Sequence, residues 1–280
     1  MIAFLGTGLM GAEFVRGLLA RGEKVRVWNR TAARAEALRS AGAELAADPA
    51  EAVRGCERVH LSLGDDAAVE SVLARALPAL APDALVLDHT TTAPLPTAER
   101  TRRLRTQGIA YVHAPVFMGP RNARDATGLM LVCGEPTLLA RAKPILQTMS
   151  GKLLDLGADP ARAAAFKLFG NLMIVFISSG LGDLFALANG LGIAPAEARD
   201  LFDSFKASNT LDLRGKRMAN GDYSATFELA MARKDVRLMQ ETAAATGVKL
   251  EVLPAIAEHM DALIAQGLGA QDLGVVAKRR

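Results

Sequence analysis

The chain of 280 residues is long enough to bury a sizeable core, and chains of this length normally form two domains. Half of its residues are apolar and 22% are charged, a composition that excludes a disordered protein. The net charge of +3 comes from scattered arginines rather than from a run of like charges, so we expect no nucleic-acid partner, while an anionic small ligand fits.

Over residues 1–157, short β-rich runs alternate with helical patterns. The β-rich runs are IAFL, VRVW, VHLSL, ALVLDH and IAYVH, and helical stretches such as AEFVRGLLARG and TAERTRRLRTQG lie between them. Strands that alternate with helices indicate βαβ units and a parallel sheet covered on both faces. We therefore predict a doubly wound α/β domain over residues 1–157.

The first β-rich run leads into three glycines with a defined spacing. Gly6, Gly8 and Gly11 follow the pattern G-x-G-x-x-G between a strand and a helix. Such glycines allow a tight turn, the approach of a pyrophosphate to the backbone, and packing of the helix on the strand. A plain glycine turn is the alternative, but the flanking strand and helix favour a Rossmann-type dinucleotide site.

The second β-rich run ends in WNRT and bears on the choice of cofactor. Many NAD sites carry an Asp or Glu here that binds the ribose 2′-hydroxyl. Asn29 and Thr31 are uncharged, and the guanidinium of Arg30 could pair with the 2′-phosphate of NADP. We therefore predict NADPH, with NAD less favoured; the alternative is that Arg30 merely faces solvent.

Over residues 158–280, helical periodicity replaces the β-rich runs, so we predict an all-α second domain joined to the first by a long helix. This domain is expected to serve substrate binding and oligomerisation. Its longest apolar stretch, residues 172–181, contains Ser178, Ser179 and Gly180. We expect this stretch to be too short to span a bilayer, and therefore no membrane partner.

The cysteines and histidines bear on the cellular compartment and on metal binding. Cys56 and Cys133 show neither metal nor disulfide spacing, so a reducing cytoplasm is expected. The N-terminus lacks a basic region, and we expect no signal peptide. His60, His89 and His259 have no partners at ligand spacing, so we expect no metal site.

The stretch FKLFGN, residues 166–171, places an ammonium group in an apolar segment. Lys167 and Asn171 are four residues apart, so a helix projects both from one face. Their apolar neighbours are expected to leave the amine partly desolvated. The alternative is a lysine that extends to solvent or pairs with Asp235.

Together, several motifs resemble the 3-hydroxyisobutyrate dehydrogenase, or β-hydroxyacid dehydrogenase, family over essentially the whole chain. GTGLMG is similar to its Gly-x-Gly-x-Met-Gly motif, DHTTTAP to its Asp-x-Ser-Thr-x-x-Pro loop, and HAPVFMG to its substrate loop Asp-Ala-Pro-Val-Ser-Gly-Gly. FKLFGN resembles the catalytic Lys-x-x-x-Asn segment, Lys234 with Asp235 resembles the cofactor-closing Lys-Asp, and GLGAQDLG resembles the last substrate-side loop.

This resemblance implies a Rossmann domain followed by a helical domain, and an enzyme that transfers hydride between NADPH and a small carbonyl compound or β-hydroxy acid. It implies that Lys167 is the general acid and base, and that Asn171 binds the substrate or holds the amine. The implied cofactor residues are Gly6, Thr7, Gly8, Leu9, Met10, Asn29, Arg30, Thr31, Leu63, Gly64, Thr91 and Lys234. The implied substrate residues are Pro115, Val116, Phe117, Met118, Gly119 and Asp235.

The substrate loop departs from the pattern of this family. Phe117 and Met118 replace Ser-Gly, and His113 replaces the acidic residue. Bulky side chains therefore stand where small residues let backbone amides approach a carboxylate. We expect either a larger or less polar carbonyl compound, or a carboxylate bound by other groups. The candidates for binding it are Asn122, Arg124 and Lys234.

Three functions follow. The first is an NADPH-dependent reductase of small aldehydes or keto compounds, such as the semialdehyde or glyoxylate reductases of the similar family. The second is an imine reductase, which fits Phe117 and Met118 but typically carries another residue in place of Lys167. The third is a non-catalytic NADP-binding protein. We also expect the long apolar helices to form a homodimer or homotetramer.

Overall fold

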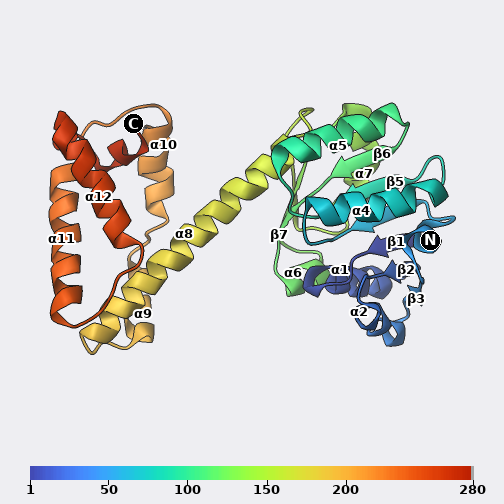
Figure 1. The fold of residues 1–280 in the computed structure, drawn as a ribbon, viewed down its shortest axis with the longest axis horizontal. Coiled ribbons are helices and arrows are strands. Elements are labelled where there is room, and N and C mark those ends of the chain that lie inside the picture. The colour runs from blue at the N-terminus through green and yellow to red at the C-terminus, as the bar shows by residue number, and fades with distance from the viewer. Residues whose placement is uncertain (279–280) are drawn as a thin grey trace. The chain divides into compact units, whose positions relative to one another are not determined.

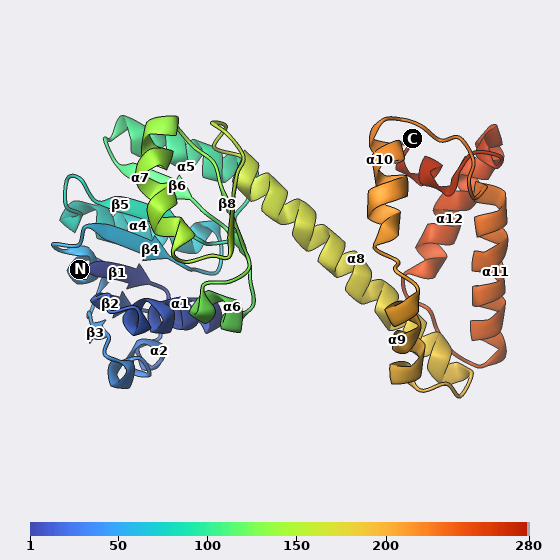
Figure 2. The ribbon, with the colours of Figure 1, turned by 180° about the vertical axis from the view of Figure 1, so that it is seen from behind.

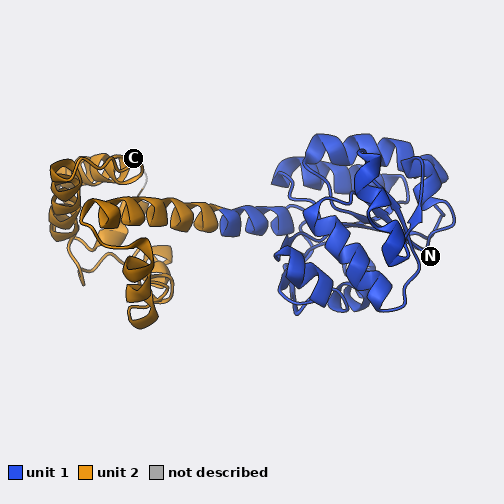
Figure 3. Cartoon of the chain, turned by 90° about the horizontal axis from the view of Figure 1, so that it is seen from below, with its two compact units in different colours: residues 1–171 blue, residues 172–280 orange. Residues whose placement is uncertain are grey.

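A computed structural model describes residues 1–278 and divides the chain into two compact units, Met1–Asn171 and the part that begins at Leu172 (Figure 3). The division falls inside the long helix α8 (Arg162–Gly190), whose first ten residues belong to the first unit. The boundary predicted between residues 157 and 158 lies just before this helix, and it stays a prediction.

The first unit contains the predicted parallel sheet (Figure 1). Its six strands lie in the order β3-β2-β1-β4-β5-β6, and every neighbouring pair is parallel. The strands are β1 (Ile2–Leu5), β2 (Val25–Trp28), β3 (Glu44–Leu45), β4 (Arg58–Leu61), β5 (Leu85–Asp88) and β6 (Ala110–His113). The predicted doubly wound α/β domain is therefore confirmed.

Helices cover both faces of this sheet because its central strand is apolar on both sides. Ile2 and Phe4 of β1 pack in one core, whereas Ala3 and Leu5 pack in another, as side chains of a strand alternate between faces. The first core includes α1 (Leu9–Ala20), and the second includes α3 (Pro49–Val53), α4 (Asp66–Ala76) and α5 (Pro94–Thr106). The short helix α2 (Ala32–Glu36) follows β2.

A small second sheet, which the sequence patterns did not reveal, follows β6. It consists of β7 (Val116–Phe117), β8 (Leu129–Val132) and β9 (Lys152–Asp155), with β7 antiparallel and β9 parallel to β8. Helix α6 (Pro120–Asp125) connects β7 to β8 and packs against α1, while α7 (Pro136–Gln147) packs near β6 (Figure 2). The predicted substrate loop thus includes strand β7 and leads into α6.

The second unit is helical, as predicted. Beyond the end of α8 it contains α9 (Pro195–Ser204), α10 (Lys216–Ala219), α11 (Leu229–Ala245) and α12 (Leu253–Leu263), with short helical turns at Leu211–Gly215, Ile264–Leu268 and Leu273–Ala277. Leu229, Val236, Met260 and Val275 belong to its buried core. Helices α11 and α12 pack against each other through this core.

Helix α8 is the long helix that was predicted to join the two domains. It continues for 29 residues through Ser178, Ser179 and Gly180, because single Ser and Gly residues cost a long helix only about 0.5–1 kcal/mol each. By length and composition alone it could cross a membrane, since an 18-residue window within it has a mean hydropathy of 1.7. Core helices of soluble proteins meet the same criterion, so the expected lack of a membrane partner stays a prediction, but the argument from length was wrong.

Candidate cofactor and reaction site

The first and third glycines of the motif are required by the packing of the turn after β1. Gly6 has a φ of 97°, in the left-handed region, and an added methyl group would lie 2.3 Å from the carbonyl oxygen of Ser62. A methyl group on Gly11 would lie 1.9 Å from the carbonyl oxygen of Gly6. Both glycines therefore allow α1 to pack directly on the turn.

The second glycine, Gly8, faces open space instead. Within 4 Å an added methyl group would meet only the guanidinium of Arg34, at 4.0 Å. Gly8 also caps α1, whose first turn has no side-chain cap and no acidic residue. The amides at this N-terminus and the helix dipole therefore suit an anion that approaches the backbone closely.

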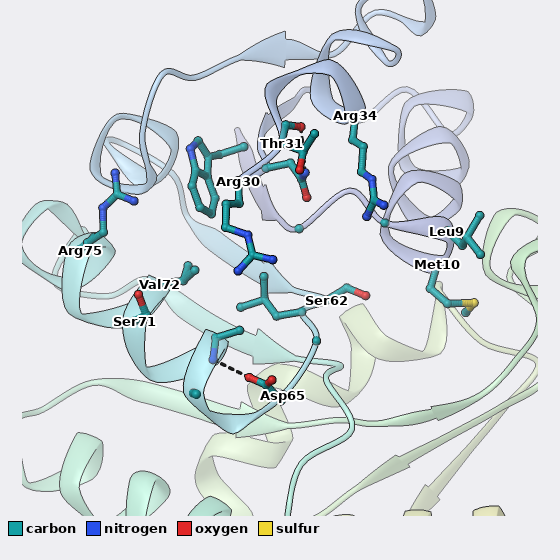
Figure 4. A pocket seen from close by; sticks show the side chains of 18 residues that line it. Leu9, Met10, Arg30, Thr31, Arg34, Ser62, Asp65, Ser71, Val72 and Arg75 are labelled. Atoms are coloured by element: carbon teal, nitrogen blue, oxygen red, sulfur yellow. Dashed lines mark hydrogen bonds between the residues drawn. The ribbon is translucent and has the colours of Figure 1, made fainter.

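A cavity of about 810 Å³ opens beside this turn (Figure 4). It lies between the glycine turn, the end of β2, and the loop from β4 into α4. Nine of the predicted cofactor residues line it, namely Gly6, Gly8, Leu9, Met10, Asn29, Arg30, Thr31, Leu63 and Gly64. The structure thus brings together residues from three segments that together span more than fifty positions of the sequence, at the place where a dinucleotide binds in this fold.

The other predicted cofactor residues lie outside this lining. Thr7 is buried, and its N–H donates to Oδ1 of Asn29 at 3.0 Å, so the Asn29 amide holds the glycine turn in place. Thr91 is exposed beyond the end of β5. Lys234 lies on α11 in the second unit, with its ammonium 2.9 Å from the carboxylate of Asp235.

Three guanidinium groups make the cavity attractive to phosphate. Figure 4 shows Arg30 extending into the cavity and Arg34 reaching toward the glycine turn, while Arg75 lies over the ring of Trp28 at 5.5 Å. The carboxylate of Asp65 caps α4. Neither Arg34 nor Arg75 was predicted from the sequence. Arg34 lies four residues after Arg30, and this closeness was the available signal for it.

His113, which stands where the similar family has an acidic residue, supports the loop that follows β5. Its buried Nε2 lies 2.9 Å from the carbonyl oxygen of Thr90 and 3.1 Å from Oγ1 of Thr92. A carbonyl can only accept, so Nε2 carries the proton. The hydroxyl of Thr90 in turn accepts from the N–H of Leu63 at 3.0 Å, which ties this loop to the loop after β4.

His60 and His89 form a buried pair that the sequence analysis missed. The ring atoms Nδ1 of His60 and Nε2 of His89 lie 3.0 Å apart, and Nδ1 of His89 lies 2.8 Å from the carbonyl oxygen of Ala114. His89 therefore donates to Ala114 and accepts from His60, so both rings are neutral. The two residues are 29 positions apart, His60 on β4 and His89 directly after the neighbouring strand β5, and no spacing rule indicates such a pair.

These histidines predict a pH-dependent stability. Burial lowers the pKa of His60, His89 and His113 below the ordinary value. As pH falls below about 6.5, the unfolded chain takes up protons that the folded chain does not, so the free energy of unfolding should fall by up to about 4 kcal/mol per pH unit for three histidines. Urea denaturation between pH 7.5 and 5 measures this slope.

The His60→Phe variant is expected to lower that slope by about 1.4 kcal/mol per pH unit, the contribution of one proton. The ring of His60 stacks on Phe4, so a phenyl ring can occupy the same place. The His259→Gln variant, outside this cluster, is the control. A wild-type stability that is flat between pH 7.5 and 5 would contradict the neutral, buried pair.

Lys167 is nearly buried, as the sequence predicted. Its residue is 9% exposed, and its Nζ donates to Oδ1 of Asn171 at 2.9 Å. The same ammonium lies 4.1 Å from the centroid of the Phe117 ring. Desolvation lowers the pKa of Lys167 from its ordinary value. The alternative of a lysine that extends to solvent does not fit this burial, whereas a pair with Asp235, in the second unit, stays a hypothesis.

The substrate loop is held by its own contacts. Asn122 accepts from the N–H of Gly119 and donates to Oγ1 of Thr127, both at 2.9 Å. Arg124 binds the carboxylate of Glu13 on α1 at 2.5 Å. Of the predicted substrate residues, Pro115 and Val116 are buried, while Phe117, Met118 and Gly119 are partly exposed.

Comparison with known proteins agrees with this geometry. Residues 1–157 match the NAD-binding domain of 6-phosphogluconate dehydrogenase, and residues 161–279 match the NAD-binding domain of NADP-dependent 3-hydroxyisobutyrate dehydrogenase. The chain is 28% identical to 3-sulfolactaldehyde reductase of Escherichia coli over 99% of its length and 95% of that protein. It is 29% identical to NAD-dependent L-serine dehydrogenase of Pseudomonas aeruginosa, over 99% and 96%.

A solved imine reductase from Streptomyces aurantiacus is similar to the chain with a TM-score of 0.88 and 26% identity, covering 98% of this chain and 97% of that one. The two family matches leave only residues 158–160 between them. The motifs, the fold and the family matches agree along the whole chain. It therefore belongs to the 3-hydroxyisobutyrate dehydrogenase family and is an NAD(P)-dependent oxidoreductase of the hydroxyacid and semialdehyde reductase type.

Proposed function

We propose that this protein reduces small aldehydes or keto compounds with NADPH, and that Lys167 is the general acid and base of the reaction. The observation that carries this proposal is the position of the Lys167 ammonium, which is nearly buried and held at 2.9 Å by Asn171. Few soluble proteins bury a lysine without a carboxylate partner unless it has a function, because desolvation of a charge is costly.

Lys167 and Asn171 can perform the proton transfer of such a reduction. When bound, the reduced nicotinamide supplies a hydride to the carbonyl carbon. Negative charge then develops on the carbonyl oxygen, and the ammonium of Lys167 donates a proton to it, which completes the hydroxyl group. The side chain of Asn171 orients the amine during this step. In alcohol oxidation the neutral amine takes the proton back.

The preference for NADPH rests on the end of β2. Arg30 and Arg34 line the cavity there, and neither has an ion-pair partner among residues 1–278. Guanidinium groups bind phosphate oxygens with paired hydrogen bonds, so they suit the 2′-phosphate of NADP. An acidic residue for the NAD ribose is replaced by Asn29, whose amide instead binds the glycine turn.

The test follows the loss of reduced-nicotinamide absorbance with NADPH and with NADH. The carbonyl substrates are butanal, succinic semialdehyde and glyoxylate, and a cyclic imine is assayed beside them. Turnover of a carbonyl compound with NADPH supports the proposal. Turnover of the imine alone would support imine reduction, which the aromatic ring of Phe117 and the similar imine reductase favour. NADPH binding without any turnover would indicate a non-catalytic protein.

We also propose that two or more copies associate through α8. Six consecutive residues of this helix, 172–177, are apolar, and all except Met173 are more than half exposed. The strongly exposed ones are Leu172, Ile174, Val175, Phe176 and Ile177. Such a surface needs a partner, and a second copy satisfies it by symmetry.

The buried, unpaired thiols of Cys56 and Cys133 fit a reducing, cytoplasmic location.

The Val175→Glu variant is expected to dissociate this assembly. A carboxylate on the apolar face would be buried without a partner, which costs several kcal/mol. Multi-angle light scattering should therefore give a dimer or tetramer for the wild type and a smaller species for the variant. Lys24→Glu, on the surface of the first unit, is the control. A monomeric wild type would contradict the prediction.

A further inference from the structure

The ring of Phe117 lies directly on helix α8 beside Lys167. A methyl group on Gly170 would lie 2.2 Å from Cζ and 2.5 Å from Cε1 of this ring. The ring therefore occupies the space that only a glycine leaves open. Because its centroid is 4.1 Å from the Lys167 Nζ, the ring also covers one side of the ammonium group.

The groups that were expected to bind a substrate carboxylate have partners of their own. Arg124 is paired with the carboxylate of Glu13, a side chain that is only 12% exposed and that also binds Arg16 at 2.6 Å. Both ends of the Asn122 amide are engaged within the loop. On α11 the ammonium of Lys234 faces Asp235.

We propose, building on the reductase function above, that Phe117 makes the site selective for uncharged aldehydes and ketones over those with a carboxylate. The face of an aromatic ring is electron-rich and repels an anion, whereas methylene groups of a substrate are stabilised when they leave water and pack against the ring. A carboxylate beside this ring would also lose its hydration, and the ring covers the side of the Lys167 ammonium that faces it. Phe117 is thus a specificity-determining residue.

The first experiment compares butanal with succinic semialdehyde, which share a four-carbon chain and differ by the carboxylate. With NADPH, the wild type is expected to show a kcat/KM at least about tenfold higher for butanal. The Phe117→Ser variant should reduce this ratio by about tenfold or more, because it removes the ring and opens the loop. A wild-type preference for succinic semialdehyde would overturn the specificity proposal while leaving the reductase function intact. Failure to reduce any carbonyl compound would overturn both.

The second experiment moves the ring without changing it. In Gly170→Ala the new methyl group must displace the Phe117 ring, so kcat/KM for butanal should fall by about tenfold even though alanine is the better helix former. In the Phe117→Ser background the same substitution should have almost no effect. Gly182→Ala, in the same helix with nothing within 4 Å of its added methyl group, is the matched control. An equal loss in both backgrounds would mean that the ring is not responsible.

Discussion

The Lys167→Ala variant is expected to lower kcat for carbonyl reduction by about 10² to 10⁴, the usual contribution of a positioned proton donor. Hydride transfer would remain possible, but water would have to protonate the developing alkoxide. The binding of NADPH should be unchanged, because the cavity beside the glycine turn does not contain this lysine. Stopped-flow measurement of NADPH oxidation, with NADPH binding followed by fluorescence, separates the two effects.

The pH profile provides a second readout for the same residue. Carbonyl reduction needs the ammonium form, so the rate should fall as pH rises through the pKa of Lys167, which desolvation places below its ordinary value. In Asn171→Asp a carboxylate would replace the amide oxygen that lies 2.9 Å from Nζ. The new negative charge should raise the lysine pKa and shift this limb to higher pH.

The exposed Lys152 on β9 serves as the control, and Lys152→Ala should change neither rate nor profile. If Lys167→Ala reduced aldehydes at the wild-type rate, the proton would have to come from another group, and the proposed role of the lysine would be wrong. An unchanged alkaline limb in Asn171→Asp, with normal folding, would argue against titration of the lysine.

Removing the guanidinium groups at the end of β2 is expected to weaken NADPH specifically. A hydrogen bond to a charged group contributes about 1.5–3 kcal/mol, so Arg30→Ala and Arg34→Ala should each raise the KM for NADPH by about 10- to 100-fold. The KM for NADH should change little, because NADH has no 2′-phosphate. The double variant should therefore lose most of the preference for NADPH.

A neighbouring arginine provides the control for this prediction. Arg39 follows α2 and is paired with Glu36, so Arg39→Ala should leave both KM values unchanged. Equal losses with NADH and NADPH in the Arg30 and Arg34 variants would mean that these residues bind the shared part of the dinucleotide. A wild-type preference for NADH would contradict the proposed cofactor choice altogether.

Local sequence patterns were sufficient for the features that depend on neighbours along the chain. The alternation of strands and helices predicted the parallel sheet, because period and burial are set by consecutive residues. The glycine spacing predicted the turn, since Gly6 and Gly11 meet across only five positions. The four-residue spacing of Lys167 and Asn171 predicted their hydrogen bond on one helical face.

The small sheet β7-β8-β9 was not predicted because β7 is two residues long and its pairing with β8 is set by the loop between them. The apolar extent of α8 was underestimated, because Ser178, Ser179 and Gly180 were taken to interrupt its apolar stretch, although the helix continues through them. The positions of Arg34 and Arg75 in the cavity lining were also not predicted, since both lie on helices whose orientation toward the cavity depends on packing.

By itself, then, the sequence determined the fold class, the glycine turn and the lysine that the reaction is proposed to use, because each is a pattern of nearby residues. Only the tertiary structure decided what surrounds that lysine. Phe117 meets Gly170 across 53 positions, and Arg124 pairs with Glu13 across 111. Contacts of this range depend on how strands and helices pack, and they surround the lysine with the groups that we propose select its substrates.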